Sequence, residues 1–256
     1  MIGSLFKRIG PIAALTLGAT VAGCGSVDMK INGQEGVPLS EVDMSGDVPT
    51  ELVVSANAKV VVTEGDTLEI TVENDDEDAL RFVRDDGLLG VTLDPDREIR
   101  NGNAIVRVTM GAPESIVIAG AGSVESDSAS ANPEIAIGGS GEVSIKEFAA
   151  ETLEVTIGGS GSVTGAGRAD RLEVAIGGAG SVNFAELTTD KAEVTIGGSG
   201  DVAFMSDGEV DASIAGSGDI NVTGDAKCTV NSLGSGTLTC NRRAETSEPV
   251  AEIEAD

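Results

Sequence analysis

A short glycine-rich block recurs through the second half of the chain, and it constrains the fold more than any other feature. The last glycines of successive blocks are 19, 20, 19, 20, 18 and 18 residues apart. A period this narrow indicates structural units that stack on one another. The blocks are residues 119–122, 138–141, 158–161, 177–180, 197–200, 215–218 and 233–236.

Apolar and polar residues alternate before each block, as in residues 153–157 and 172–176. A period of two is typical of a β-strand with one buried face. A single unit cannot bury that face alone, so stacking should align the apolar residues in interior ladders. The first predicted ladder is Ile118, Ile137, Ile157, Ile176, Ile196 and Ile214. The second is Val124, Val143, Val163, Val182, Val202 and Ile220.

The fold class expected from this pattern is all-β. The repeats predict a parallel β-helix, or β-solenoid, of about seven coils, expected to be right-handed, with an N-terminal β-strand region capping one end. Glycine is needed at the corners, where φ is positive or backbones approach closely. The expected domains are a signal peptide (1–23), a tether (24–40), an N-terminal β region (41–110), the solenoid (111–241) and an acidic disordered tail (242–256).

The first residues have the pattern of an export signal. Lys7 and Arg8 precede an apolar stretch that is too short to span a bilayer and that ends in the residues Val-Ala-Gly before Cys24. This ending resembles a bacterial lipobox, which implies that Cys24 receives the lipid and becomes the mature N-terminus. Because Gly25 follows, the resemblance implies an outer-membrane lipoprotein. The alternative is a plain secretory peptide with a coincidental cysteine.

Composition excludes several functions. With 43 acidic and 16 basic residues the formal net charge is −27, which repels nucleic acid. Histidine is absent, so Ser-His or Cys-His catalysis and histidine metal sites are excluded. Tryptophan and tyrosine are absent too, which removes the strongest stacking platforms for sugars and bases. No cofactor is expected.

The order of the motifs resembles one known family. Residues 60–66, and then residues 105–110 leading into 116–124, are similar to the putative auto-transporter adhesin, head GIN domain family. The resemblance covers about residues 40–240. It implies a β-helical protein of the cell envelope, with an adhesin-like, non-catalytic role and an unknown envelope or extracellular partner, either a protein or a glycan.

Three other functions would each require different features of the sequence. A calcium-binding β-roll would repeat every nine residues with a regular aspartate, whereas the position of Asp201 is Ser162 and Ser181 in other repeats. A polysaccharide-acting β-helix enzyme would pair its carboxylates in a cleft, whereas the outward acids here are spread along a column. A periplasmic accessory that binds a ligand or cations stays open as the alternative.

The outward acids fall at one repeated position, seven residues before the last glycine of each block. They are Glu134, Glu154, Glu173, Glu193 and Asp211, and we call them the acid column. Arg171 and Lys191, two residues upstream, should offset part of the repulsion. The column is either a solvated acidic face or a site where divalent cations settle, since oxygen ligands suit Ca²⁺ and Mg²⁺.

Cys228 and Cys240 fall on inward positions of the last coil. An exported protein can oxidise such a pair. Facing sheets lie about 10 Å apart, so a disulfide would require the last coil to taper. The pair is therefore either a disulfide or two buried thiols that fill space.

Overall fold

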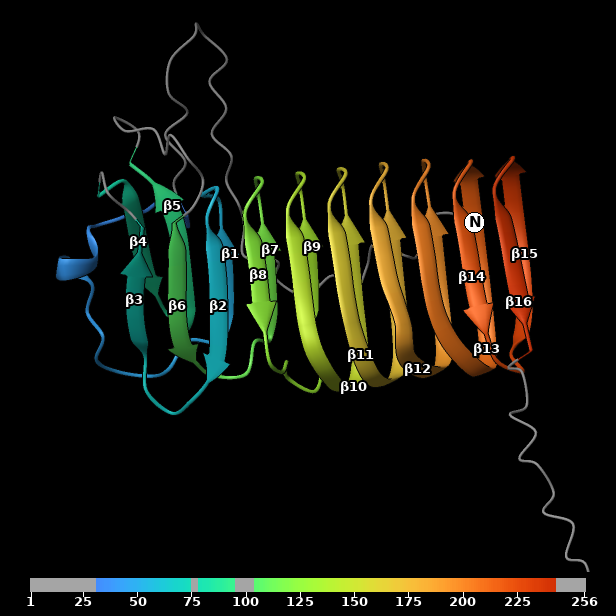
Figure 1. Cartoon of the computed structure of the whole chain (residues 1–256), viewed down its shortest axis with the longest axis horizontal. Helices are drawn as coiled ribbons and strands as arrows, with labels where there is room; N and C mark the ends of the chain where they lie inside the picture. The colour runs from blue at the N-terminus through green and yellow to red at the C-terminus, as the bar shows by residue number, and fades with distance from the viewer. Residues whose placement is uncertain (1–30, 75–77, 95–103, 243–256) are drawn as a thin grey trace, which may run out of the picture.

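The structure is a computed structural model that describes residues 31–74, 78–94 and 104–242 (Figure 1). The described residues contain one 3-10 helix, η2 (Leu39–Glu41), and no α-helix. All other regular structure is β, and the coils stack into a rod, so the predicted all-β, parallel β-solenoid is confirmed. The predicted signal peptide and residues 243–256 of the predicted tail lie outside the described residues.

The strands fall into an N-terminal group and a repeat group. The N-terminal group is β1 (Glu51–Val54), β2 (Lys59–Glu64), β3 (Glu69–Glu73), β4 (Leu80–Asp85), β5 (Leu88–Leu93) and β6 (Ile105–Met110). The repeat group is β7 (Ser115–Ile118), β8 (Ser123–Ser126), β9 (Glu134–Ile137), β10 (Glu142–Ile157), β11 (Ser162–Ile176), β12 (Ser181–Ile196), β13 (Asp201–Gly216), β14 (Asp219–Thr223), β15 (Lys227–Gly234) and β16 (Thr237–Asn241).

Each coil crosses two β-layers. The long strands β10 to β13 bend in the middle, so their N-terminal halves lie in one layer and their C-terminal halves in the other. The first layer contains β4, β5, β1, β7, β9, the C-terminal halves and β15. The second layer contains β3, β6, β2, β8, the N-terminal halves, β14 and β16. A glycine block turns the chain between the layers.

The N-terminal strands do not stack in sequence order. The strand β1 lies between β5 and β7 and is parallel to both, and β2 lies in the same way between β6 and β8. The coil made by β1 and β2 is therefore inserted between two coils that follow it in the chain. Beyond them, β4 and β3 close the two layers as antiparallel strands. The predicted N-terminal β region does form this end of the rod, but the spatial order of its strands cannot be read from the repeats.

The segment before β1 packs against this end. Ile31 is only 2% exposed and belongs to a cluster with Val53, Val83 and Leu88. Val37 forms a two-residue antiparallel bridge with Phe82 of β4. Residues 31–40, which the sequence placed in the tether, are thus attached to the sheet by the buried side chain of Ile31 and by the backbone hydrogen bonds of Val37.

The interior consists of the ladders that the periodicity predicted. Ile137 pairs in register with Ile118 and Ile157, and the ladder continues in the same register to Ile214. Every member of both predicted ladders is at most 2% exposed. Parallel stacking in register therefore gives each apolar side chain a similar neighbour above and below.

Glycine is required at the corners by close approach of stacked backbones. A Cβ on Gly159 would lie 2.1 Å from the carbonyl oxygen of Gly139 in the preceding coil, and one on Gly178 would lie 2.2 Å from that of Gly159. Neither glycine has a left-handed φ. At these corners it is the absent side chain, and not backbone flexibility, that matters.

One irregularity in the core is compensated between coils. The inward position of β11 next to Ile145 holds Gly165, and the ring of Phe148 from β10 fills this space. The Phe148 ring also contacts the ring of Phe184 in β12 edge to face, with ring centroids 5.7 Å apart. The large ring from one coil therefore replaces the side chain missing from the next.

Candidate functional site

The candidate site is the outer face of the first layer, where the acid column lies. Glu154 pairs in register with Glu134 on one side and Glu173 on the other, and Glu193 and Asp211 continue the line. The structure therefore brings together all five predicted residues. In parallel strands, such neighbours lie about 4.8 Å apart.

The column extends further than the sequence indicated. Ser115 pairs with Glu134, and Glu51 of β1 pairs with Ser115, so Glu51 is one more carboxylate in the same line. Sequence reasoning missed Glu51 because it lies outside the repeats and reaches the column only through the non-sequential insertion of β1.

Burial and like charges act together on the first two carboxylates of the acid column. Partial burial raises the pKa of the Glu134 carboxyl above its ordinary value, and the charge of Glu51 adds to the rise. Partial burial also raises the pKa of Glu154, and Glu134 and Glu173 add to it. Near neutral pH, the charged form of these carboxylates is therefore less favourable in the folded chain than in the unfolded chain.

Basic residues lie beside the column without pairing to it. Arg171 and Lys191 are neighbours in register, and the same column of positions holds Thr152 and Glu209. In the part of the chain that the structure describes, no ion pair within 4.0 Å joins Arg171 or Lys191 to the acid column. Their charges can offset repulsion only through space, as long and flexible surface side chains do.

Small side chains flank the column on its other side. The neighbouring outward positions along the first layer are Ala136, Thr156, Ala175, Thr195 and Ser213. None of these side chains is large enough to cover the carboxylates. Ala136 packs against the cluster that contains Ile31 and Val117, and beyond it a flat or extended partner can reach the column.

The geometry is that of a line and not of a cage. Among the described residues, no group of three or more Asp, Glu, Cys or His side chains is arranged to hold a metal ion. Divalent cation binding along the column stays a prediction with no defined coordination sphere.

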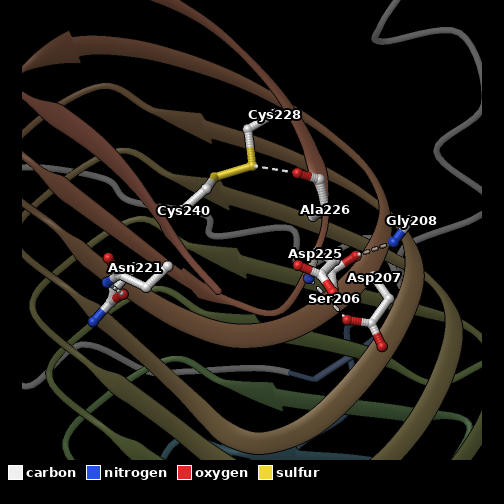
Figure 2. The surroundings of a disulfide bond; sticks show 9 residues. Ser206, Asp207, Gly208, Asn221, Asp225, Ala226, Cys228 and Cys240 are labelled. Atoms are coloured by element: carbon white, nitrogen blue, oxygen red, sulfur yellow. Dashed lines mark hydrogen bonds between the residues drawn. A yellow bond between two sulfur atoms is a disulfide. The ribbon is translucent and has the colours of Figure 1, made fainter. Parts of the chain in front are cut away.

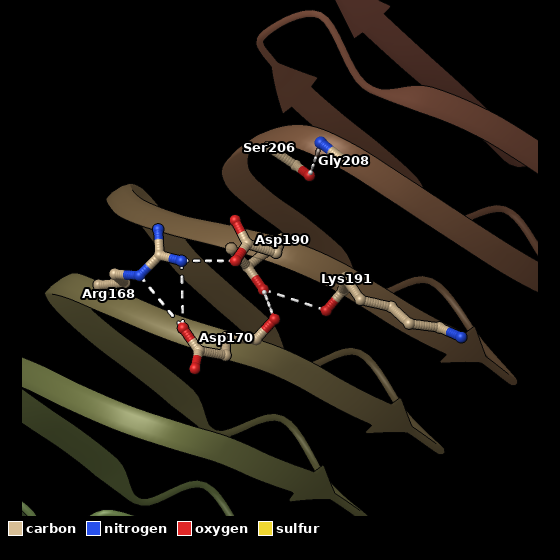
Figure 3. A network of polar contacts seen from close by, with 7 residues as sticks. Arg168, Asp170, Asp190, Lys191, Ser206 and Gly208 are labelled. Carbon is tan, nitrogen blue, oxygen red and sulfur yellow. Dashed lines mark hydrogen bonds and ion pairs between the residues drawn. The ribbon is translucent and has the colours of Figure 1, made fainter.

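A second polar cluster lies at the bend of the coils (Figure 3). Arg168 forms ion pairs with Asp170, at 3.1 Å, and with Asp190 of the next coil. Beneath them the buried Thr189 hydroxyl donates a hydrogen bond to the backbone carbonyl of Lys191, at 3.0 Å. The three charged side chains are more than half exposed, so this network contributes little energy and serves to shape the corner.

The last coil contains a disulfide between Cys228 of β15 and Cys240 of β16, with Cα atoms 6.8 Å apart (Figure 2). In register, Cys228 stacks on Val210 and Cys240 on Val222, which are inward positions as expected. The two layers therefore approach each other at this end of the rod, below the usual separation of about 10 Å.

Cys24, the predicted lipid attachment site, lies outside the described residues. Within the described ranges, there is no helix that has the length and apolar character needed to cross a membrane.

Comparison with known families gives a match over most of the chain. The model of the family described as putative auto-transporter adhesin, head GIN domain, matches residues 49–226. This range includes the N-terminal strands, the acid column and all but the last coil of the rod. No curated protein matches the chain.

Similar solved structures include proteins from Bacteroides and Parabacteroides species. A putative adhesin from Bacteroides fragilis is 20% identical with a TM-score of 0.65, covering 77% of this chain and 93% of its own. A putative lipid binding protein from Parabacteroides distasonis is 20% identical with a TM-score of 0.58, covering 78% and 94%. A putative adhesin from Parabacteroides merdae is 17% identical with a TM-score of 0.56, covering 77% and 93%. At these identities the likeness shows the fold alone.

Proposed function

Because this chain belongs to the putative auto-transporter adhesin, head GIN domain family, we propose that it is a lipid-anchored, non-catalytic binding module of the bacterial cell envelope. The family description and the adhesin-named structures suggest a non-enzymatic protein at the cell envelope or surface. In this proposal the lipid on Cys24 holds the rod at the outer membrane, and the rod presents one long face to a partner.

The acid column is the observation that supports this proposal most directly. Its five carboxylates occupy successive coils in register, which at about 4.8 Å per coil is a line of about 19 Å. The flanking small side chains leave that line open. An extended partner with several positive charges, such as a Lys- or Arg-rich segment or an amino-bearing glycan, matches this charge and shape.

The face is tested by removing charge from one layer at a time. The double variant Glu154→Gln, Glu173→Gln should lose binding to envelope preparations, and wild-type binding should weaken as salt rises. The matched control is Glu142→Gln, Asp201→Asn, which removes the same charge from the second layer and should bind normally. Equal binding by both double variants would exclude the acid column as the binding face.

The anchor is tested by Cys24→Ser. Loss of acyl chains removes about 0.8 kcal/mol of membrane affinity per buried methylene, so the variant should move from the membrane fraction to the soluble fraction. The mass of the mature wild-type N-terminus provides an independent check on cleavage before Cys24. A variant that stays with the membrane as tightly as wild type would contradict lipid anchoring.

The second candidate is a periplasmic accessory that binds a ligand or cations. One of the similar structures is described as a putative lipid binding protein, so lipids belong in the ligand panel. Protease treatment of intact cells separates the two candidates. A surface-exposed adhesin-like rod is removed by the protease, whereas a periplasmic accessory survives until the outer membrane is permeabilised.

A further inference from the structure

The C-terminal coil ends the rod with two free strand edges. The strand β15 pairs with β13, and β16 pairs with β14, and no further strand among the described residues covers their outer edges. At the other end, the segment around η2 lies across the end of the rod (Figure 1), and Leu39, Val42, Met44 and Val48 pack against the core. An uncovered edge is a template for pairing with another strand.

The uncovered end is also apolar. Val230 is 46% exposed although it stacks on the buried Ala212, and Leu238 stacks in the same way on the buried Ile220. Both side chains point inward in the coil, so they form the exposed cross-section of the core. Leu233, at the nearby corner, is 81% exposed.

The last coil differs from the rest of the rod in charge. Residues 227–242 contain Lys227 and Arg242 and no Asp or Glu, in a chain whose net charge is −27. The acid column ends one coil earlier, where Asp211 pairs with Thr229. Two copies of this chain repel through their acidic faces, and this end is a surface where they can meet without carboxylates facing each other.

We propose that the C-terminal coil is the interface of a tail-to-tail dimer with a second copy of this chain. A two-fold axis perpendicular to the layers reverses strand direction and keeps each layer in line. It therefore pairs β15 with the β15 of the second copy, and β16 with its β16, both antiparallel. Both sheets then continue across the interface, and the disulfide holds the two edges in place beforehand (Figure 2).

Side-chain orientation limits the register, and the burial of apolar side chains selects among the registers that remain. The strands β15 and β16 run in opposite directions, and Cys228 is bonded to Cys240. Val230, two residues after Cys228, therefore lies across from Leu238, two residues before Cys240. Inward residues must face inward residues, and among the registers that allow this we take the one centred on Val230 and Leu238, because it buries these partly exposed apolar side chains against each other. Val230 then meets Val230 of the second copy, and Leu238 meets its counterpart, in one continuous core.

The same register places Lys227 opposite Leu233 of the second copy. The aliphatic part of the lysine side chain can cover that exposed leucine while its ammonium group stays in water. The two Lys227 residues are six positions apart along the paired strands, which is about 20 Å. The basic residues of the two copies therefore do not repel each other strongly.

Leu233 provides the sharpest test because it is largely exposed and its replacement should not disturb the fold. The purified whole chain, kept in mild detergent, should sediment as a dimer in a concentration-dependent way. Leu233→Arg faces Lys227 of the second copy and should raise the dimer dissociation constant about tenfold or more. Leu233→Glu faces the same lysine and should lower it. An ordinary hydrophobic contact would be weakened by both.

Cross-linking tests the position of the axis. Residues that face each other in antiparallel strands have Cα atoms about 4.5 to 5.5 Å apart, within reach of a disulfide. Val230→Cys should therefore give a covalent dimer under oxidising conditions, with the new bond between the two substituted positions by mass spectrometry. Thr156→Cys, which is exposed in the middle of the rod, is the control and should stay monomeric.

Three outcomes would overturn the proposal. The first is a monomer at all concentrations up to several hundred micromolar. The second is a dimer whose dissociation constant is unchanged by Leu233→Arg and whose Val230→Cys variant does not cross-link. The third is a monomeric chain that dimerises only after truncation behind Arg242, since residues 243–256 would then occupy the edge in place of a second copy.

Discussion

Replacing Glu154 with Gln tests whether repulsion between the carboxylates of the acid column destabilises the fold. Glu154 has a carboxylate neighbour on both sides, Glu134 and Glu173, at the spacing of parallel strands. Two unit charges about 4.8 Å apart repel by about 0.9 kcal/mol at the dielectric constant of water. With a screening length of about 8 Å at 0.15 M ionic strength, each repulsion falls to about 0.5 kcal/mol. The substitution should therefore stabilise the fold by about 1 kcal/mol at neutral pH.

The pH dependence has a definite sign. The pKa values of Glu134 and Glu154 are raised in the folded state, so over a range above the ordinary value of about 4.3 the folded chain binds more protons than the unfolded chain. The free energy of unfolding contributed by these groups is therefore largest below the unfolded pKa, and it is lost as pH rises through the folded pKa values. Wild type should gain stability from this source on mild acidification from pH 7 toward pH 5.

Urea unfolding at several pH values and salt concentrations measures both effects. Glu142→Gln is the matched control, because Glu142 lies on the same strand and its register neighbours are Ser123 and Ser162. The advantage of Glu154→Gln should exceed that of the control at pH 7, shrink toward pH 4 and shrink in 1 M NaCl. If both variants gained equally, or if the gain survived high salt, repulsion within the column would not be its cause.

The core, the corners, the disulfide and the acid column each give a further expectation. Phe148→Ala should destabilise by about 3 to 5 kcal/mol in urea unfolding, because the ring is 2% exposed and also fills space in the next coil; a loss below about 1 kcal/mol would contradict that packing. Gly159→Ala should lower the melting temperature sharply because its Cβ would lie 2.1 Å from a carbonyl oxygen, whereas Gly158→Ala, with its nearest atom at 3.9 Å, should be tolerated; equal melting temperatures would refute the close-approach account. Reducing the bond between Cys228 and Cys240, which are 12 residues apart, should cost up to about 3 kcal/mol; hydrogen exchange should then rise first in the last coil, and unchanged exchange there would oppose this. If divalent cations bind the acid column, millimolar Ca²⁺ should raise the melting temperature beyond NaCl at equal ionic strength; equal responses would leave a solvated face.

The periodic part of the molecule could be predicted from the sequence because each coil repeats the same local environment. The alternation before each glycine block placed Ile157 and Val163 in the core, and the same spacing aligned Glu154 with its neighbours. It also assigned Cys228 and Cys240 to inward positions. In each case one residue's surroundings follow from its equivalents one period away.

The remaining features depend on contacts that have no equivalent one period away. Nothing in the repeats indicates that β1 lies between β5 and β7, and so Glu51 could not be assigned to the acid column. Ile31 looked like part of a polar tether because a single apolar residue carries no periodic signal. The space above Gly165 is filled by a ring from another coil, which only the three-dimensional packing reveals.

The inserted coil of β1 and β2 has a consequence for the order in which the chain can fold. This coil emerges first during synthesis or export, yet its two neighbours are made from residues 88–110 and 115–126. It has no edge to pair with until those residues have followed, so the first stable nucleus must close long loops. Each later coil then pairs with the free strand edges of the coil that has already folded before it. The chain should therefore remain unfolded through its first half and then fold in one direction, which suits the export across a membrane that we propose for it.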